Sequence, residues 1–214
     1  MKRLGCLPLL LLALAGCERA AEPEAKAAAG ASCCAVDAAA APGAATAAAV
    51  PAAGESIYAL DSSWRNQEGR ALRLGDLAGR PRVLAMIFTH CEYACPRILA
   101  ELRALESALT GPPDAGPGFV LVSFDTARDD PAALKAYAEA QGLDPARWLL
   151  LHGETAAVRE LSVVLDVPFR SDVDGGFSHA SVISVLDGEG RLLHQKRGLG
   201  GALDDSRAAM LSAR

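Results

Sequence analysis

Residues 82–88 read Arg-Val-Leu-Ala-Met-Ile-Phe, and this almost continuous apolar run is the feature that most limits the possible folds. A strand without polar alternation has to be covered on both faces, as happens in parallel sheets flanked by helices. A helical pattern follows from Pro96 to Leu109, with proline at the first position, where its missing N–H is tolerated. Together the two segments predict the first strand–helix unit of an α/β domain.

The same alternation continues to the end of the chain. Further strands are expected at 119–124 and 148–151, and helices at 131–141 and 155–165. The turn sequence Asp-Gly-Glu-Gly joins two strand patterns, 181–186 and 191–196, and predicts a hairpin. A last helix is expected over 203–211. This order predicts an α/β fold with a mixed, mostly parallel central sheet flanked by helices, ending in a β-hairpin and a helix.

The first 16 residues resemble an export signal. A basic start precedes an apolar run at 4–13, which is shorter than the about 20 residues that span a bilayer. The run ends in Leu-Ala-Gly followed by Cys17, which resembles the bacterial lipobox, whose cysteine is lipidated. An ordinary signal peptide with an incidental Cys17 is the alternative. We expect a lipid anchor at Cys17 and a domain that faces the periplasm of a bacterial envelope, an oxidising compartment.

Residues 17–54 are rich in Ala, Pro and Glu and contain almost no large apolar side chain, so they are expected to form a flexible stalk. Cys33 and Cys34 lie in this stalk, either as an incidental pair or as an aid to metal capture. The folded domain is expected over 55–214. Because the net charge is -5 and no basic stripe is present, nucleic-acid binding is not expected.

Cys91 and Cys95 lie between the first predicted strand and its helix. Ligands gather beyond the carboxyl ends of parallel strands, and the positive end of a helix stabilises a thiolate. A thiolate is both a nucleophile and a metal ligand. The pair is therefore a candidate redox or metal site, with a structural disulfide as the alternative.

Three segments resemble the SCO/SenC family. Residues 88–96, Phe-Thr-His-Cys-Glu-Tyr-Ala-Cys-Pro, resemble its Cys-x-x-x-Cys-Pro motif. Val-Ser-Phe-Asp at 122–125, with Arg-Asp at 128–129, is similar to its second-strand signature, and Phe-Ser-His at 177–179 resembles its histidine segment. The likeness runs from about residue 55 to residue 195 and covers most of the predicted domain.

The resemblance implies a thioredoxin-like fold and a role in delivering one copper ion, as Cu(I) or Cu(II), to the copper A subunit of cytochrome c oxidase. It implies Cys91, Cys95 and His179 as the metal ligands. The residue chemistry agrees, because thiolates suit Cu(I) and imidazole suits both copper oxidation states. We also expect a redox gate, since a disulfide between Cys91 and Cys95 could not bind copper. A monomer is expected.

The alternative function is that of a thiol–disulfide oxidoreductase, in which Cys91 and Cys95 act on cysteines of the oxidase subunit or of other proteins. Thioredoxin-like reductases usually place a cis-proline before the strand that faces the active site. Residues 177–180 read Phe-Ser-His-Ala instead, which favours metal binding. A peroxide-reducing enzyme would need a threonine and a cysteine at another spacing, with a supporting arginine, and the sequence does not show that set. A copper or redox sensor is a further class.

Other polar residues leave alternatives open. His90 adjoins Cys91 and is either a fourth ligand or a residue that tunes the site; divergence of neighbouring side chains on an extended segment favours tuning. Asp125 ends a strand on the same sheet edge and either orients His179, caps a helix or bonds within its own loop. His152, at the end of another strand, is a weaker candidate.

Overall fold

The computed structural model describes residues 56–108, 116–173 and 175–213. The predicted signal peptide and stalk, together with Cys17, Cys33 and Cys34, lie outside these residues. Within the described part of the chain, no helix is long and apolar enough to cross a bilayer.

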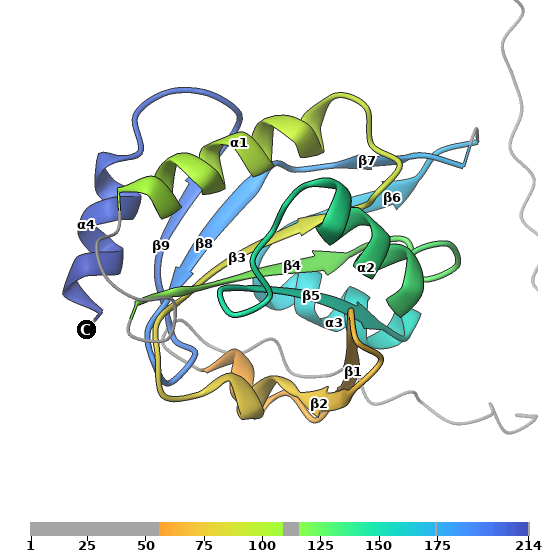
Figure 1. Cartoon of the computed structure of the whole chain (residues 1–214), viewed down its shortest axis with the longest axis horizontal. Coiled ribbons are helices and arrows are strands. Elements are labelled where there is room, and N and C mark those ends of the chain that lie inside the picture. The colour runs from red at the N-terminus through yellow and green to blue at the C-terminus, as the bar shows by residue number, and fades with distance from the viewer. Residues whose placement is uncertain (1–55, 109–115, 174, 214) are drawn as a thin grey trace, which may run out of the picture. The chain divides into compact units, whose positions relative to one another are not determined.

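Seven strands form the central sheet, in the order β2-β1-β5-β4-β3-β8-β9 (Figure 1). Their bounds are β1 Ser63–Asn66, β2 Ala71–Arg73, β3 Arg82–Ile87, β4 Gly118–Ser123, β5 Trp148–Gly153, β8 Val182–Leu186 and β9 Leu192–Arg197. The central strands β5, β4 and β3 are parallel, and the remaining pairs are antiparallel. The expected mixed sheet is confirmed, with parallel pairing at its centre and antiparallel pairing toward both edges.

The helices flank this sheet. Their bounds are α1 Ala94–Ser107, α2 Pro131–Ala140, α3 Thr155–Val164 and α4 Asp204–Ser212, with short 3-10 helices η1 Ile57–Ala59 and η2 Leu74–Leu77. Right-handed crossovers in one direction along the sheet put α1 and α2 on the same face, and Figure 1 shows α3 on the other. Asp130 caps α2, accepting from the Ala133 N–H at 2.8 Å.

Helix α1 begins two residues earlier than the sequence predicted. Its first residue is Ala94, so Cys95 lies inside the first turn and Pro96 occupies the third position instead of the first. The first four N–H groups of a helix have no partner within the helix, so proline is tolerated at the third position as well. The predicted last residue, Leu109, lies outside the described residues. The earlier start places Cys95 among the free N–H groups of the first turn.

The strands that end at the candidate site are anchored in the core. β3 and β4 are buried along their whole length, as their apolar composition predicted. On neighbouring strands, the Phe119 and Trp148 rings stack with centroids 4.6 Å apart. Large aromatic side chains contribute strongly to core stability because each buries about 150–250 Å². The stack lies at the amino ends of β4 and β5, so it anchors the edge of the sheet opposite the carboxyl ends from which the candidate site is built.

A second sheet consists of β6 (Phe169–Ser171) and β7 (Phe177–His179), which pair in antiparallel register. Neither strand was predicted from the sequence, and neither were β1 and β2. Strands of three or four residues are too short to show an alternating pattern clearly. The hairpin that was not predicted ends at His179, one of the candidate ligands.

Candidate metal centre

The turn between β3 and α1 carries both cysteines. The Cys91 N–H donates to the Phe88 carbonyl at 3.3 Å and folds the chain back at the end of β3. The Cys95 N–H, in the first turn of α1, points at Cys91 Sγ over 3.3 Å. Both cysteines are free thiols in the structure. The helix start therefore supplies a donor directly to the Cys91 sulfur, as its position in the sequence suggested.

The two thiols have opposite environments. Partial burial raises the pKa of Cys91, but hydrogen bonds from Cys95, Tyr93 and Ala94 outweigh it and leave that pKa below its ordinary value. Cys95 is buried, and burial together with its interaction with Cys91 raises its pKa well above the ordinary value. Cys91 is therefore the sulfur that ionises first and reaches solvent.

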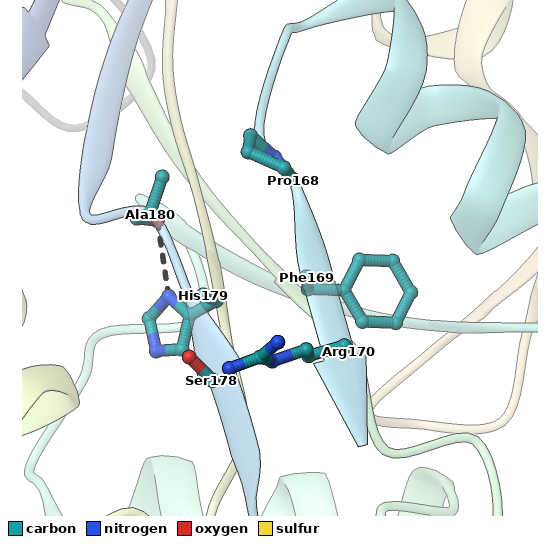
Figure 2. Close-up of a pocket in the computed structure, with 6 residues that line it drawn as sticks. All are labelled: Pro168, Phe169, Arg170, Ser178, His179 and Ala180. Atoms are coloured by element: carbon teal, nitrogen blue, oxygen red, sulfur yellow. Dashed lines mark hydrogen bonds between the residues drawn. The ribbon is translucent and has the colours of Figure 1, made fainter. Parts of the chain in front are cut away.

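His179 enters the site from β7. Its Nδ1 lies 3.0 Å from the carbonyl oxygen of Ala180, a contact drawn as the dashed line in Figure 2. Because a carbonyl only accepts, Nδ1 is the protonated nitrogen of the neutral ring. Its Nε2 lies 3.9 Å from Cys95 Sγ. The ring therefore presents an unprotonated nitrogen to the thiols, which is the form that binds a metal ion.

Aromatic side chains pack against the His179 ring. His179 pairs in register with Phe169, and Phe177 lies two residues before it, so the three side chains project from one face of the hairpin. The His179 ring contacts Phe124 at a centroid separation of 4.9 Å and Phe88 at 6.1 Å. These contacts hold the imidazole against the ends of β3 and β4.

The three predicted residues come together in space. One ligand atom from each of Cys91, Cys95 and His179 lies within 4.8 Å of the other two. Bonds of about 2.0–2.3 Å from a metal ion to imidazole nitrogen and thiolate sulfur put the ligands of a trigonal site about 3.5–4 Å apart. The arrangement fits a metal ion after a small contraction, and it equally fits a dithiol that closes to a disulfide.

The other polar candidates lie outside this triad. His90 Nδ1 lies 3.0 Å from Thr89 Oγ1 and 3.7 Å from a carboxylate oxygen of Asp129. Asp125 does not orient His179; its carboxylate bonds within its own loop, to the Arg128 backbone N–H at 3.1 Å and to the Arg128 side chain. The loop alternative for Asp125 is therefore correct. His152 Nδ1 lies 3.0 Å from the Asp129 carbonyl oxygen, which accounts for that ring structurally.

A pocket of about 300 Å³ opens beside His179, lined by Pro168, Phe169, Arg170, Ser178, His179 and Ala180 (Figure 2). The Arg170 side chain reaches from β6 toward Ser178 in this view. No role for Arg170 was predicted from the sequence, because β6 and β7 were not recognised as a hairpin. The contacts of Phe88 and Phe124 with His179 were missed as well, because they depend on tertiary packing.

Comparison with known proteins identifies the family. Residues 54–200 match the model of the SCO1/SenC family. A Stutzerimonas stutzeri protein provisionally named a copper-binding protein is 31% identical over 120 residues, 54% of this chain. The match spans 57% of that relative, less than two thirds of its length. The SCO1 protein homolog of Bacillus subtilis is 25% identical over 143 residues, 64% of this chain and 72% of that protein.

A solved structure of a Sco protein has the same fold as this chain. The structure of Bradyrhizobium japonicum ScoI with copper bound superposes with a TM-score of 0.58 at 24% identity and covers 76% of this chain and all of that one. The expected thioredoxin-like fold is thereby confirmed. Since the family match extends over well more than half of the sequence, the chain belongs to the SCO1/SenC family.

Proposed function

We propose that the chain is a copper chaperone that binds one copper ion through Cys91, Cys95 and His179. The observation that carries the proposal is the convergence of two sulfurs and one imidazole nitrogen within 4.8 Å of one another. Thiolates favour Cu(I), and imidazole accommodates both copper oxidation states. The lowered pKa of Cys91 and the unprotonated Nε2 of His179 suit this role because metal ligands must be deprotonated.

The site is also suited to passing the metal on. Three ligands leave room for a further ligand, and Cys91 is only partly buried. An incoming sulfur or nitrogen of a partner could therefore bond to the copper before the resident ligands leave. The recipient in this proposal is the copper A subunit of cytochrome c oxidase, reached from a lipid anchor at Cys17 on the periplasmic side of the membrane. Membership of the SCO1/SenC family supports this recipient.

The same two sulfurs make the site sensitive to oxidation. A disulfide of a partner protein can accept two electrons and two protons from Cys91 and Cys95. The partner disulfide is then reduced to two thiols, and the sulfurs of Cys91 and Cys95 form one S–S bond. A disulfide offers no thiolate to the metal. The oxidised chain would therefore be unable to load copper, and reduction would restore binding.

Titration of the reduced, full-length chain with Cu(I) against a competing chelator tests the proposal. We expect the wild type to bind one copper ion tightly and His179→Ala to lose at least about 100-fold in copper affinity. Replacing a residue that only hydrogen-bonds to a metal ligand already lowers metal affinity by about 10–100-fold, and loss of a ligand should cost more. Cys91→Ser and Cys95→Ser should lose more. His194→Ala, on β9 outside the site, is the control. Unchanged affinity and copper spectrum in His179→Ala would falsify the three-ligand site.

A second function, thiol–disulfide exchange, is favoured by the asymmetry of the two cysteines. The more exposed Cys91 has the lowered pKa and would attack a partner disulfide, and the buried Cys95 would then displace the partner from Cys91. Measuring the reduction potential of the pair tests this role. A potential near the about -270 mV of thioredoxin, with rapid turnover of protein disulfides, would support it. Slow turnover of protein disulfides would contradict the exchange function and leave only the copper chaperone role.

A further inference from the structure

One short segment touches both halves of the proposed metal site. Residues 124–129, here called the clasp, follow β4 and lead into α2. The Phe124 ring lies against His179. Two further clasp residues, Arg128 and Asp129, reach in opposite directions, one to the hairpin that carries His179 and the other to the turn that carries Cys91.

The Asp129 arm fixes the cysteine turn. Its side chain is fully buried. One carboxylate oxygen accepts from the Thr89 hydroxyl at 2.6 Å, and the other accepts from the Thr89 N–H at 2.9 Å and the Ser123 hydroxyl at 2.5 Å. Because Thr89 lies two residues before Cys91, these bonds tie the cysteine turn to the end of β4.

The Arg128 arm fixes the histidine hairpin. Its Nε donates to the Asp125 carboxylate, and another guanidinium nitrogen donates to the Gly175 carbonyl, between β6 and β7. Gly175 has φ +75°, a left-handed backbone conformation that favours glycine. Asp125 orients the guanidinium, and Arg128 connects the clasp to the hairpin four residues before His179.

The hairpin needs such a connection. β6 and β7 form a two-stranded sheet of their own, separate in hydrogen bonding from the seven-stranded sheet that carries the cysteine turn. An isolated two-stranded hairpin is marginally stable in water. Packing of Phe177 on Phe88, with centroids 5.2 Å apart, attaches the hairpin to the end of β3. The Arg128 contact at Gly175 attaches it a second time, between β6 and β7.

We propose that Arg128, oriented by Asp125, is a positioning residue that holds the His179 hairpin at bonding distance from the Cys91–Cys95 turn. The inference rests on the proposed function, since it assigns Arg128 a role in metal binding. Loss of the hydrogen bond from Arg128 to Gly175 would let His179 move away from the site while the two sulfurs remain in place. Copper would then be held by sulfur alone and would pass more quickly to a competing ligand.

The test uses Arg128→Ala in the full-length chain, loaded with one Cu(I). X-ray absorption should show about two sulfur neighbours in both proteins, but the nitrogen neighbour of the wild type should be lost or reduced in the variant. Transfer of Cu(I) to a chelator should be about 10-fold faster. Arg128→Lys, which keeps the charge but lacks the planar fork, should restore these properties in part. Arg65→Ala, at an exposed position on β1, is the control.

A metal-free measurement separates this inference from the proposed function. In the apo protein, Arg128→Ala should speed amide hydrogen exchange in β6 and β7 by about 10-fold and leave β3 and β4 unchanged. Equal exchange and an unchanged copper spectrum would overturn the positioning role. Faster exchange in β3 and β4 as well would also overturn it, because Arg128 would then stabilise the whole domain. Failure of the wild type to bind copper would contradict the proposed function, while the exchange result would still test the clasp.

Discussion

His179 Nε2 lies 3.9 Å from Cys95 Sγ, although 84 positions of sequence separate the two residues. Cys95 belongs to the first turn of α1, whereas His179 is the last residue of β7. The two groups therefore meet across a boundary between a helix packed on the main sheet and a separate hairpin. Copper binding at this boundary, as proposed, would depend on the protonation of each group and on the contacts that hold the helix and the hairpin together.

In the metal-free chain, the neutral ring of His179 should carry its proton on Nδ1. The reason is its 3.0 Å contact with the Ala180 carbonyl, which requires a donor. Long-range ¹H–¹⁵N correlation spectra distinguish the two neutral tautomers directly. A spectrum in which Nε2 carries the proton would show that the ring is turned away from the Ala180 bond. His194 serves as an internal reference on β9.

Cys91 should react with iodoacetamide much faster than Cys95. Hydrogen bonds lower the pKa of Cys91 despite its partial burial, so its thiolate fraction at neutral pH exceeds that of an ordinary cysteine. Burial raises the pKa of Cys95 and has the opposite effect. The rate for Cys91 should therefore rise at lower pH than in a model thiol. Mass spectrometry of peptides after short exposure measures both rates.

Cys95→Ala provides the matched control for that measurement. The substitution keeps the backbone N–H at position 95 but removes a thiol that also donates to Cys91. We expect the pKa of Cys91 to move up toward its ordinary value and its reaction profile to shift to higher pH. If the pH dependence of the Cys91 reaction rate did not shift, the backbone N–H donors alone would account for the lowered pKa of Cys91.

The strands and helices around the cysteine turn could be predicted because their patterns are long. The six-residue strands β3 and β4 are buried throughout, and a continuous apolar run is readable in a sequence. The start of α1 was predicted two residues too late because proline is favoured at the first position, while the chain accepts Pro96 at the third. Local preference could not decide between two positions of the same turn.

The supports of the site could not be predicted. Arg128 and Asp129 adjoin one another in a charged loop, yet one bonds to the hairpin and the other to the cysteine turn. A charged loop is typical of a solvated surface, and nothing in its composition shows that Asp129 is buried. Partnerships of this kind depend on tertiary packing, which short-range patterns do not contain.

Asp129→Asn should destabilise the domain by about 1–3 kcal/mol, because an amide cannot accept at both of its termini and leaves a buried donor from Thr89 or Ser123 without a partner. Equilibrium denaturation with urea measures the change. Asp130→Asn, at the next position, is the control, since asparagine caps a helix about as well as aspartate and should change stability by less than about 0.5 kcal/mol. Equal effects of the two substitutions would contradict the special role of Asp129.

Oxidation should abolish copper binding by the chain and reduction should restore it. Diamide takes two electrons and two protons from a dithiol, and the Cys91 and Cys95 sulfurs are near enough to each other to form the resulting disulfide. Copper retained after oxidation can be measured by gel filtration and metal analysis, with the Cys91–Cys95 disulfide confirmed by mass spectrometry of peptides. His179→Ala supplies the control, because it keeps both thiols and should form the disulfide as the wild type does. If the oxidised wild type still retains copper, the metal is bound elsewhere and the redox gate is wrong.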